Sequence, residues 1–368
     1  MNTIQKSSYM ILSCLILFLV ASCGSNTKEK AKLSPEQIES TYSSGVVLIK
    51  NSYYYTISFN GGIPPFYFTG VNEDGEPENL TIDPKEREEA VVFGTGFFIS
   101  KDGLIATNSH MASPQVDISS ARSSIMDFFR SWANEMSKEI NEFNEKLGIL
   151  HLAILSAESY SEQLEYQQTY NELVKERDKK QEIVNTLQSL GSRDYEVTLH
   201  TDLGVAFNGT HVTNMNDFHD CVTVADDPSH DLAIIQLKDK ITPEKNHIFK
   251  IPAGENSDQS EGNGKSKKKG VKVGEKLYMI GFNLGPNLAL TNQGVKAQVT
   301  SGEVSQDKDD AQIMYTIPAL HGSSGSPVID EYGKLIAVNY AGLDNTQNFN
   351  YGVKARHLKK LLTKFKDE

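Results

Sequence analysis

Three short segments of the chain carry side chains that could perform covalent chemistry. The first runs from Gly94–Ser100 through an Asp-Gly turn into a second apolar run, and His110 follows it. The second places Asp231 directly before the wholly apolar run Leu232–Leu237. An unpaired buried carboxylate is costly, so a carboxylate drawn into the interior there needs a donor such as an imidazole N–H.

The third segment is Leu320–Asp330, in which glycines flank Ser324 in a predicted tight turn before another strand. Such a turn exposes a hydroxyl and lets backbone N–H groups converge beside it. Each segment alone is a modest signal, because a lone histidine is more often structural and Gly-x-Ser-Gly arises by chance. Histidine, aspartate and serine in this order form a specific set, suited to nucleophilic catalysis by a serine with an imidazole base.

Composition limits the classes of protein that can position these residues. Among 368 residues, 38% are hydrophobic and 23% charged, which excludes a disordered chain and a multi-span membrane protein. The formal net charge of -12 argues against a role in binding nucleic acid. The three cysteines exclude a disulfide-based scaffold.

The N-terminus has the features of an export signal. Residues 1–22 carry Lys6 and then the apolar run Tyr9–Val20, which is too short for a permanent membrane helix. The run ends in Val20–Cys23, which resembles a bacterial lipobox and predicts lipidation of Cys23. The alternative is an ordinary signal peptide with a chance cysteine. We expect residues 23–44 to be the lipidated cysteine and a tether to the lipid bilayer, flexible over 24–36.

The middle of the chain changes character abruptly. Residues 45–59 and 91–108 are typical of strands, and 60–90 of a long surface loop. Residues 117–190 contain no proline and one glycine, Gly148, which predicts a helical hairpin whose two helices meet there. Strand patterns return at residue 195, and a short amphipathic helix closes the chain. Apolar residues of the first helix recur in steps of three or four: Ile118, Ala121, Ile125, Phe128, Trp132, Met136, Ile140, Phe143 and Leu147.

The three segments together resemble those of chymotrypsin-fold (trypsin-like) serine proteases of bacterial type. They are most similar to those of high-temperature-requirement proteases without a PDZ domain and of glutamyl endopeptidases. The resemblance covers residues 45–116 and 191–368. The resemblance implies a mainly β fold: two six-stranded antiparallel β-barrels with a long α-helical hairpin inserted in the N-terminal barrel. The implied domains are the N-terminal barrel in two parts (45–116 and 191–253), the helical hairpin insert (117–190), a loop linker (254–270), and the C-terminal barrel with its closing helix (271–368).

The resemblance also implies roles for individual residues. Ser324 would be the nucleophile, His110 the general base and Asp231 the group that orients the imidazole. The N–H groups of Gly322 and Ser324 would form the oxyanion hole, and neither a metal nor a cofactor is needed. Ser323 and His321 depart from the usual Asn and Pro of bacterial relatives, and both lie in the loop that makes this hole.

Four residues are candidates for the substrate pocket. Pro318 stands six residues before Ser324, where enzymes specific for Lys or Arg carry Asp, and the Ile336–Gly342 strand resembles the pocket wall. Neither acidic nor basic residues are therefore favoured before the cut, and we expect a small or medium apolar residue. The four candidates are Pro318, Asn339, Tyr340 and Ala341.

The sequence thus predicts a membrane-anchored serine endopeptidase that hydrolyses peptide bonds of envelope or extracellular proteins. The alternative is a catalytically silent, protease-like lipoprotein that binds a partner through its barrel and helical arm. Residues 117–190 begin close to His110 and are either an arm for partner binding or self-association, with heptad-like spacing that permits a coiled coil, or a hairpin that covers the barrel. The remaining His and Cys residues lack the spacing of a zinc site.

Overall fold

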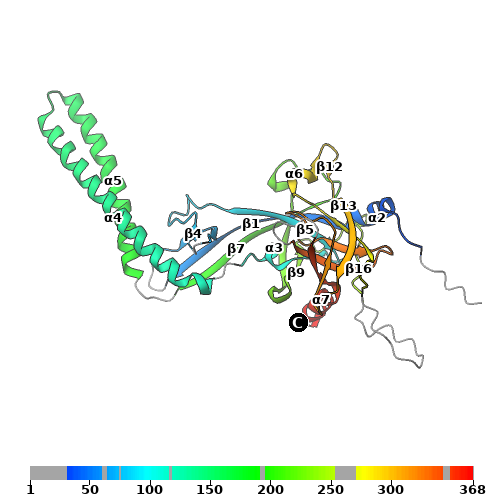
Figure 1. Cartoon of the computed structure of the whole chain (residues 1–368). Helices are drawn as coiled ribbons and strands as arrows, with labels where there is room; N and C mark the ends of the chain where they lie inside the picture. Colours follow the sequence, from blue (N-terminus) through cyan, green and yellow to red (C-terminus); the bar gives the residue numbers. More distant parts are fainter. Residues whose placement is uncertain are drawn as a thin grey trace, which may run out of the picture.

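The computed structural model describes residues 31–59, 64–73, 76–115, 118–190, 195–252, 271–342 and 349–367. Cys23, with its export signal, and the predicted 254–270 loop lie outside these residues. Within the described ranges, none of the helices combines the length and the apolar character needed to cross a bilayer. The overall shape is a two-barrel body from which a long arm projects (Figure 1).

Six strands close the first barrel in the order β1-β5-β6-β9-β8-β7, with β7 returning to pair with β1. Their apolar faces supply a buried core in which Val47, Ile49 and Ile235 are fully inaccessible. The β-branched and aromatic residues of these segments suit a half-buried pleated surface. The strands are β1 Val46–Phe59, β5 Ala90–Phe98, β6 Leu104–Thr107, β7 Tyr195–Phe207, β8 His219–Asp227 and β9 Leu232–Leu237.

The second barrel is closed by six further strands in the order β10-β13-β14-β17-β16-β15. All of its pairings are antiparallel, so the predicted fold class, two six-stranded antiparallel barrels with an inserted helical hairpin, is confirmed. The strand pair β11–β12 and the short helix α6 Pro286–Ala289 lie outside the closed barrel, between β10 and β13 in the sequence. The strands are β10 Lys276–Gly281, β11 Leu290–Thr291, β12 Gly294–Val295, β13 Gln298–Gln306, β14 Gln312–Tyr315, β15 Pro327–Asp330, β16 Leu335–Gly342 and β17 Asn350–Lys354.

One hydrophobic cluster joins the two barrels. It contains Leu48 and Phe97 of the first barrel beside Ile280 and Val338 of the second. The C-terminal helix α7 Ala355–Asp367 adds Leu358 and the neighbouring leucines to the same cluster. Because one continuous core would have to open to separate them, the two barrels are held in a fixed relation.

The expectation of a tether over residues 23–44 is wrong for its last part. Pro35–Tyr42 forms helix α2, which continues into the 3-10 turn Ser43–Gly45. The Ser34 hydroxyl accepts a hydrogen bond from the Gln37 N–H, and the Gln37 side chain accepts one from the Ser34 N–H, which is a capping box. Ile38 and Tyr42 are buried against the barrel cluster, so apolar packing holds this segment in place.

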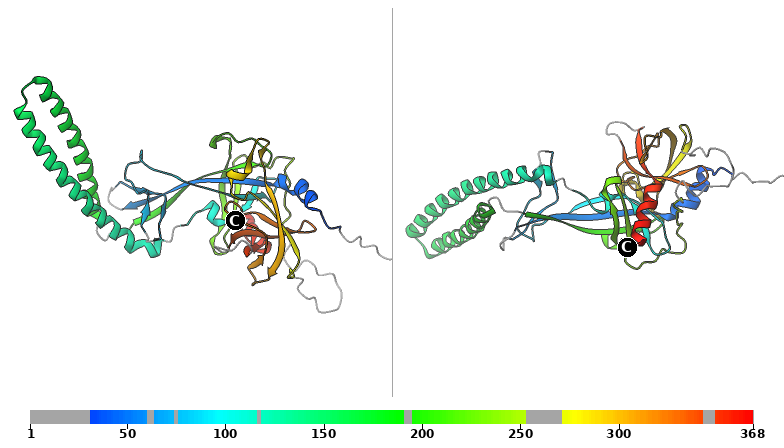
Figure 2. Two further views of the ribbon diagram at one scale, coloured as in Figure 1. Left: turned by 45° about the horizontal axis from the view of Figure 1, so that its top comes forward. Right: turned by 90° about the horizontal axis from the view of Figure 1, so that it is seen from below.

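Beyond the barrel, β1 and β7 continue as a two-stranded ribbon that carries the helical arm (Figures 1 and 2). The prediction of a surface loop over residues 60–90 is wrong for part of this range, because it contains three short strands beside the ribbon. β2 Phe66–Phe68 pairs with β1, and β3 Gly70–Val71 pairs with β4 Pro77–Glu78. Phe66 and Phe68 of β2 are buried against the ribbon residues Tyr55 and Ile57, and this packing holds β2 in place.

The arm consists of helices α4 Ile118–Ser156 and α5 Tyr160–Leu190. The prediction that the helices meet at Gly148 is wrong, because α4 continues through Gly148, which has no neighbour within 4 Å of its added Cβ. The turn is instead set by Ser159, whose hydroxyl accepts the Glu162 N–H, while the Glu162 carboxylate accepts the Glu158 N–H. A serine followed three residues later by glutamate is a helix start signal.

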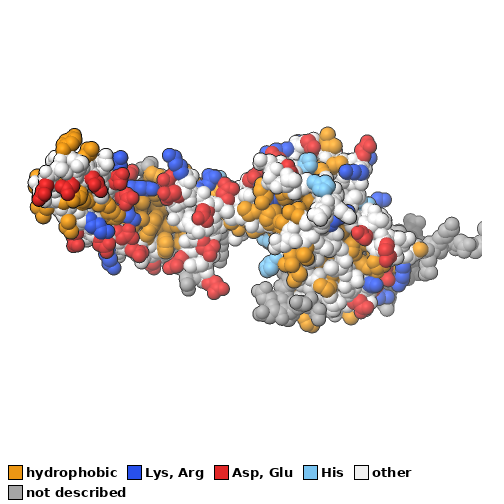
Figure 3. Space-filling view, turned by 90° about the horizontal axis from the view of Figure 1, so that it is seen from above, with side chains coloured by type: hydrophobic (Ala, Val, Ile, Leu, Met, Phe, Trp, Pro, Cys, Tyr) orange, Lys and Arg blue, Asp and Glu red, His pale blue; other side chains and the backbone are white. Residues whose placement is uncertain are grey.

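The arm does not cover the barrel, so that alternative is wrong; it points away from both barrels (Figure 2). Only its base is fixed, through a separate cluster in which Phe129 packs on Phe66 with ring centroids 4.9 Å apart. At the free end, apolar side chains gather on the surface (Figure 3). The exposed ones are Ile149, Leu152, Leu155, Tyr160 and Leu164.

We expect Phe129→Ala to destabilise the base of the arm by about 3–5 kcal/mol, the usual cost of truncating a buried aromatic side chain. Phe129 is 1% exposed, whereas Leu152 at the tip is 66% exposed. Leu152→Ala is therefore the matched control and should change the free energy of unfolding by less than about 0.5 kcal/mol. Denaturant unfolding followed by circular dichroism checks both values, and equal losses in the two variants would contradict this packing.

Candidate active site

His110 and Asp231 form a close pair on the first barrel. His110 lies in the short helix α3 Ser109–Ala112 that follows β6, and Asp231 lies directly before β9, the strand that pairs with β6. The His110 Nδ1 atom is 2.8 Å from Asp231 Oδ2 and 3.0 Å from Oδ1. The backbone N–H of His110 also donates to Oδ1, at 3.0 Å. The carboxylate therefore fixes the ring with Nδ1 toward it and Nε2 directed elsewhere.

The backbone around Asp231 supports this geometry. A 3-10 turn, Pro228–His230, ends at Asp231, whose φ of 50° is in the left-handed region that aspartate tolerates better than most residues. The Asn108 side chain donates to the Asp231 carbonyl at 2.9 Å. The Asp231 side chain is 24% exposed and that of His110 is 45% exposed. The pair thus sits at the surface, where a substrate can reach it.

Ser324 lies in a turn of the second barrel that requires glycine on both sides. Gly322 has φ +91°, and an added Cβ there would lie 2.4 Å from the Phe282 carbonyl oxygen. Gly325 has φ +85°, and its Cβ would lie 2.0 Å from the Thr95 carbonyl oxygen and 2.4 Å from the Thr107 hydroxyl. Because Thr107 is three residues before His110, this close approach brings the serine turn beside the histidine helix.

The turn also leaves two N–H groups available. Ser323 and Ser326 N–H donate to Leu320 O and Ser323 O, at 2.9 and 3.0 Å. Within the described part of the chain, neither the Gly322 nor the Ser324 N–H has a backbone acceptor. An oxygen that gains negative charge can be stabilised by such preorganised donors.

Thr95 of β5 links the two barrels at this turn. Its N–H donates to the Ser324 carbonyl at 2.8 Å, and its hydroxyl donates to the Gly322 carbonyl at 2.8 Å. The same hydroxyl accepts the Phe282 N–H at 3.0 Å, and the Thr95 carbonyl accepts the Thr107 hydroxyl at 2.8 Å. Thr95 and Asn108 lie within the sequence motifs, but the motifs predict no role for either residue. The signal was available, since a polar residue between two glycines of a buried strand needs a polar partner.

Asn339 was predicted to lie in the substrate pocket wall, and its side chain supports the serine turn from within. It is 1% exposed, and its Nδ2 donates to the Ser323 carbonyl and hydroxyl oxygens at 3.0 and 3.2 Å. Its Oδ1 accepts a hydrogen bond from the Tyr315 hydroxyl at 2.8 Å. Burial raises the pKa of Tyr315 well above its usual value, so this phenol stays protonated and donates.

The other predicted pocket residues lie nearby in the second barrel. Pro318 is exposed in the segment between β14 and the serine turn. Tyr340 is partly buried, with its ring centroid 6.3 Å from that of Tyr351, and burial raises its pKa. Ala341 pairs with Tyr351 across a bulge in β16, and its side chain is outside the described set.

A second histidine–aspartate pair, His230 and Asp227, lies next to Asp231 in the sequence and contacts helix α7. His230 Nδ1 is 2.7 Å from Asp227 Oδ2, and the His230 ring stacks on His357 of α7 at 4.2 Å. Burial lowers the pKa of His357, which favours the neutral ring in that stack. Burial also raises the pKa of the Cys221 thiol to about 12, so this cysteine is unreactive. Among the described residues no group of three His, Cys, Asp or Glu side chains is placed to hold a metal.

The chain is similar to known proteins in part of its sequence and in its structure. The family model of the trypsin-like peptidase domain matches residues 183–338, which include Asp231 and Ser324 but not His110. A serine endoprotease from Yersinia pestis is similar in structure at 12% identity and a TM-score of 0.43, over 91% of this chain and 67% of that one. An HtrA-type protease, AlgW with a decapeptide, has the same identity and TM-score over 91% and 68%. No curated protein sequence matches the chain.

The two closed six-stranded barrels carry a trypsin-like peptidase domain, matched over residues 183–338, and this match supports a serine peptidase. The long helical arm between β6 and β7 lies largely outside the matched residues.

We expect Thr95→Val to slow acylation of the nucleophile by a fluorophosphonate on the order of 10-fold, because it removes two hydrogen bonds worth about 1 kcal/mol each. Thr56→Val is the matched control, since Thr56 is a similarly buried threonine that bonds His200 on the ribbon, away from the site. The acylation rate of each variant is measured by quenching the fluorophosphonate reaction at a series of times and recording the intact mass. Equal slowing in the two variants would show that Thr95 has no special part in positioning the turn.

Proposed function

We propose that this protein is a membrane-anchored serine endopeptidase that hydrolyses peptide bonds of envelope or extracellular proteins through Ser324, His110 and Asp231. The observation that carries the proposal is the pairing of Asp231 with both the ring and the backbone N–H of His110. That double contact supports one tautomer and one ring orientation, with Nε2 free to accept a proton.

In the proposed reaction the Ser324 hydroxyl attacks the scissile carbonyl and passes its proton to His110. The imidazolium, stabilised by Asp231, then returns that proton to the leaving amine, and water repeats the sequence on the acyl-enzyme. The N–H groups of Gly322 and Ser324 would stabilise the oxyanion, an effect worth about 3–4 kcal/mol per donor. Asn339 and Thr95 would hold those donors in place through Ser323 and Gly322. No metal or cofactor takes part in this sequence.

Substrate selection before the cut is part of the same proposal. The residues expected to form that pocket, Pro318, Tyr340 and Ala341, bring neither a positive nor a negative charge. A small or medium apolar side chain is the substrate residue that such surroundings accept at least cost.

Asp231→Asn should lower kcat for hydrolysis of an unfolded protein such as casein about 10⁴-fold, because the amide favours the wrong imidazole tautomer. Ser324→Ala and His110→Ala should reduce activity at least as far. Asp227→Asn is the matched control: Asp227 pairs with His230 at 2.7 Å in the same loop but faces α7. Its activity should stay within a few-fold of wild type, and a comparable loss there would contradict the assignment of the catalytic carboxylate.

The second candidate is a catalytically silent lipoprotein that binds a partner through its barrel and arm. The apolar residues that gather at the exposed tip of the arm favour it, because an exposed apolar patch marks an interaction site more often than scattered single residues do. The arm would serve the same purpose, partner binding or self-association, on an active enzyme. Wild-type protein that cleaves no unfolded substrate would leave this binding role as the better account.

Anchoring to a membrane of a bacterial cell envelope, at the outer membrane or cell surface, is proposed from the lipobox-like Val20–Cys23. Cys23→Ser removes the thiol that would carry the lipid, so it should abolish incorporation of radiolabelled palmitate. It should also move the protein from the membrane fraction to the soluble fraction, because firm membrane binding needs several acyl chains. Cys14→Ser, within the proposed signal, is the control and should leave both unchanged. Palmitate incorporation that persists in Cys23→Ser would overturn this assignment.

A further inference from the structure

One strand of the ribbon that carries the arm has an unpaired edge. Along its whole length β7 pairs with β1, from Tyr195 opposite Phe59 to Phe207 opposite Val47. On its other side β7 pairs with β8 only over residues 203–205. Among the described strands, none pairs with that side of residues 195–201, which is therefore an open edge of the sheet.

The open edge lacks the features by which monomeric proteins protect an exposed strand. Such edges usually carry proline, lysine or a β-bulge, or a neighbouring segment covers them. Residues 195–201 contain no proline, lysine or glycine, and their register with β1 has no shift. Within the described ranges, no loop backbone bonds to that side either. The open edge thus presents a regular row of N–H and C=O groups with which another extended strand can pair.

Side chains of the open edge alternate between the two faces of the ribbon, as in any strand. The odd-numbered residues up to Leu199 belong to the apolar cluster at the base of the arm, where they are only partly buried. A neighbouring strand would cover the apolar surface that they leave exposed. The apolar face consists of Tyr195, Val197 and Leu199, and the polar face of Glu196, Thr198 and His200.

The polar face has groups that the chain leaves without a partner. Thr198 is exposed, and neither its hydroxyl nor the Glu196 carboxylate has a hydrogen bond or an ion pair within the described part of the chain. The His200 ring stacks on Tyr54 with centroids 4.6 Å apart, and its Nε2 atom is 3.1 Å from the Thr56 hydroxyl. That contact leaves the Nδ1 atom of His200 for a group on a neighbouring strand.

A second copy of the same strand fits the open edge in one register. When identical antiparallel strands are related by a two-fold axis, the axis passes through a residue that faces its own copy. The middle of residues 195–201 is Thr198, so the register centred there uses the whole edge. It places Val197 opposite Leu199 on the apolar face and Glu196 opposite His200 on the polar face.

The neighbouring registers are less favourable. An axis at Leu199 would place Glu196 opposite Asp202, and like charges directly opposite each other destabilise a sheet. An axis at Val197 would leave His200 and Thr201 without partners from β7. An unrelated extended chain has no such match to these residues, so a second copy is the occupant that the open edge favours.

We propose that two copies of this protein associate through the open edges of their β7 strands, which join into one antiparallel sheet across a two-fold axis at Thr198. Such a pair forms about six to eight backbone hydrogen bonds, and it is closed because it uses the same edge of both copies. Since β7 runs from the arm to the first barrel, the base of each arm lies beside the first barrel of the other copy (Figure 2). The inference is independent of the proposed peptidase activity.

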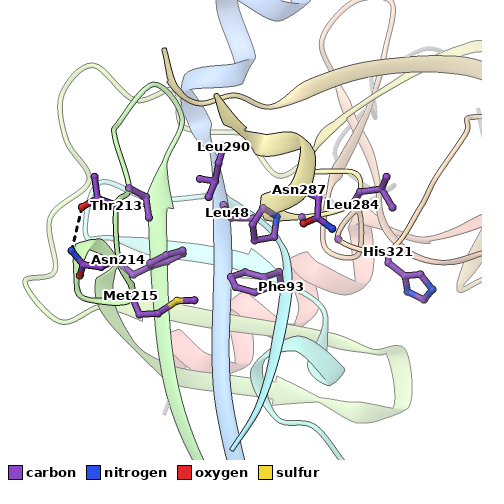
Figure 4. Close-up of a pocket in the computed structure, with 14 residues that line it drawn as sticks. Leu48, Phe93, Thr213, Asn214, Met215, Leu284, Asn287, Leu290 and His321 are labelled. Atoms are coloured by element: carbon purple, nitrogen blue, oxygen red, sulfur yellow. Dashed lines mark hydrogen bonds between the residues drawn. The ribbon is translucent and has the colours of Figure 1, made fainter. Parts of the chain in front are cut away.

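This pairing does not use the cavity beside the serine turn. That cavity, of about 520 Å³, opens between the barrels, and Phe93, Asn287 and His321 are among the residues that line it (Figure 4). Its lining residues 212–215 follow Phe207, which is about 20 Å from Thr201 along the strand at about 3.3 Å per residue. Each copy in the pair therefore keeps its own candidate active site.

A cysteine at the two-fold axis tests the proposal directly. In Thr198→Cys the two cysteines face each other with Cα atoms about 4.5–5.5 Å apart, which is within the range of a disulfide. Mild oxidation of residues 24–368 should convert most of this variant into a covalent dimer on a non-reducing gel. Cys221, the other cysteine of those residues, is buried and should contribute no cross-link.

Glu196→Cys is the matched control, because Glu196 is exposed on the same face of the same strand. In the proposed register residue 196 lies opposite His200, so the two copies of residue 196 are about 13 Å apart. Less than about a tenth of this variant should cross-link. Equal cross-linking of the two variants, or none in Thr198→Cys, would overturn the inference.

Sedimentation equilibrium measures the association without a cross-link. Wild-type residues 24–368 should dimerise reversibly, and Thr198→Lys should raise the dissociation constant at least about 10-fold, because two ammonium groups then face each other. Thr198→Glu should have the same effect, and an equimolar mixture of the two variants should associate about as well as wild type. Thr201→Lys is the control, since Thr201 is exposed on the same strand but lies opposite Tyr195, and its dissociation constant should stay within a few-fold of wild type.

The same measurement distinguishes the open edge from the tip of the arm. Leu155 at the tip is 71% exposed, and Leu155→Gln should leave the dissociation constant unchanged. Association that persists in Thr198→Lys and is lost in Leu155→Gln would assign the contact to the arm and refute the role of the open edge. Wild-type protein that stays monomeric at every concentration would refute it as well.

Discussion

The hydrogen bonds of Thr95 are the constraint on which the site depends. A serine on one barrel and a histidine on another can cooperate only if the barrels are held in register to a fraction of an ångström. Thr95 is fully buried and uses its N–H, its carbonyl and both functions of its hydroxyl to join Ser324, Gly322, Phe282 and Thr107. Because Thr107 leads into the helix of His110, one residue connects both halves of the site.

The rest of the body reinforces that register. The cluster between the barrels includes side chains from both barrels and from helices α2 and α7, so the terminal segments of the described body stabilise the same interface. Asn339 acts from behind the serine turn, where the buried Tyr315 hydroxyl fixes its amide. The donors at Gly322 and Ser324 are thus supported from two directions, which suits groups that must not reorganise during a reaction.

The helical arm has a different physical status. Its base packs on aromatic residues of the ribbon in a cluster that shares no residue with the clusters of the barrels. The arm can therefore move or bind without disturbing the barrel cores. Its free end carries exposed apolar side chains far from the two barrels (Figure 3).

The resemblance carried by the three motif segments predicted the fold class, and the long helical spacing unbroken by proline predicted the arm. The sequence did not predict the ribbon, since the residues of β1 beyond the barrel, such as Tyr53–Phe59, have the same alternation whether they lie in a barrel or extend from it. The helix end predicted at Gly148 was wrong because a glycine ends a helix when its backbone turns left-handed, and α4 continues through Gly148 to Ser156. The turn lies instead where Ser159 caps the next helix. The bonds from Asn339 to Ser323 could not be predicted, because a strand pattern does not reveal which face meets the serine turn.

The proposed roles of His110, Asp231 and Ser324 rest on the resemblance that their order along the chain carries, and the structure adds the contacts around them. The measurement that tests the central claim most directly is the intact mass of residues 24–368 after treatment with a fluorophosphonate, followed by peptide mapping. The account predicts one adduct, on Ser324, formed much more slowly in His110→Ala. The absence of an adduct, or an adduct on the neighbouring buried Ser323 or Ser326, would contradict it.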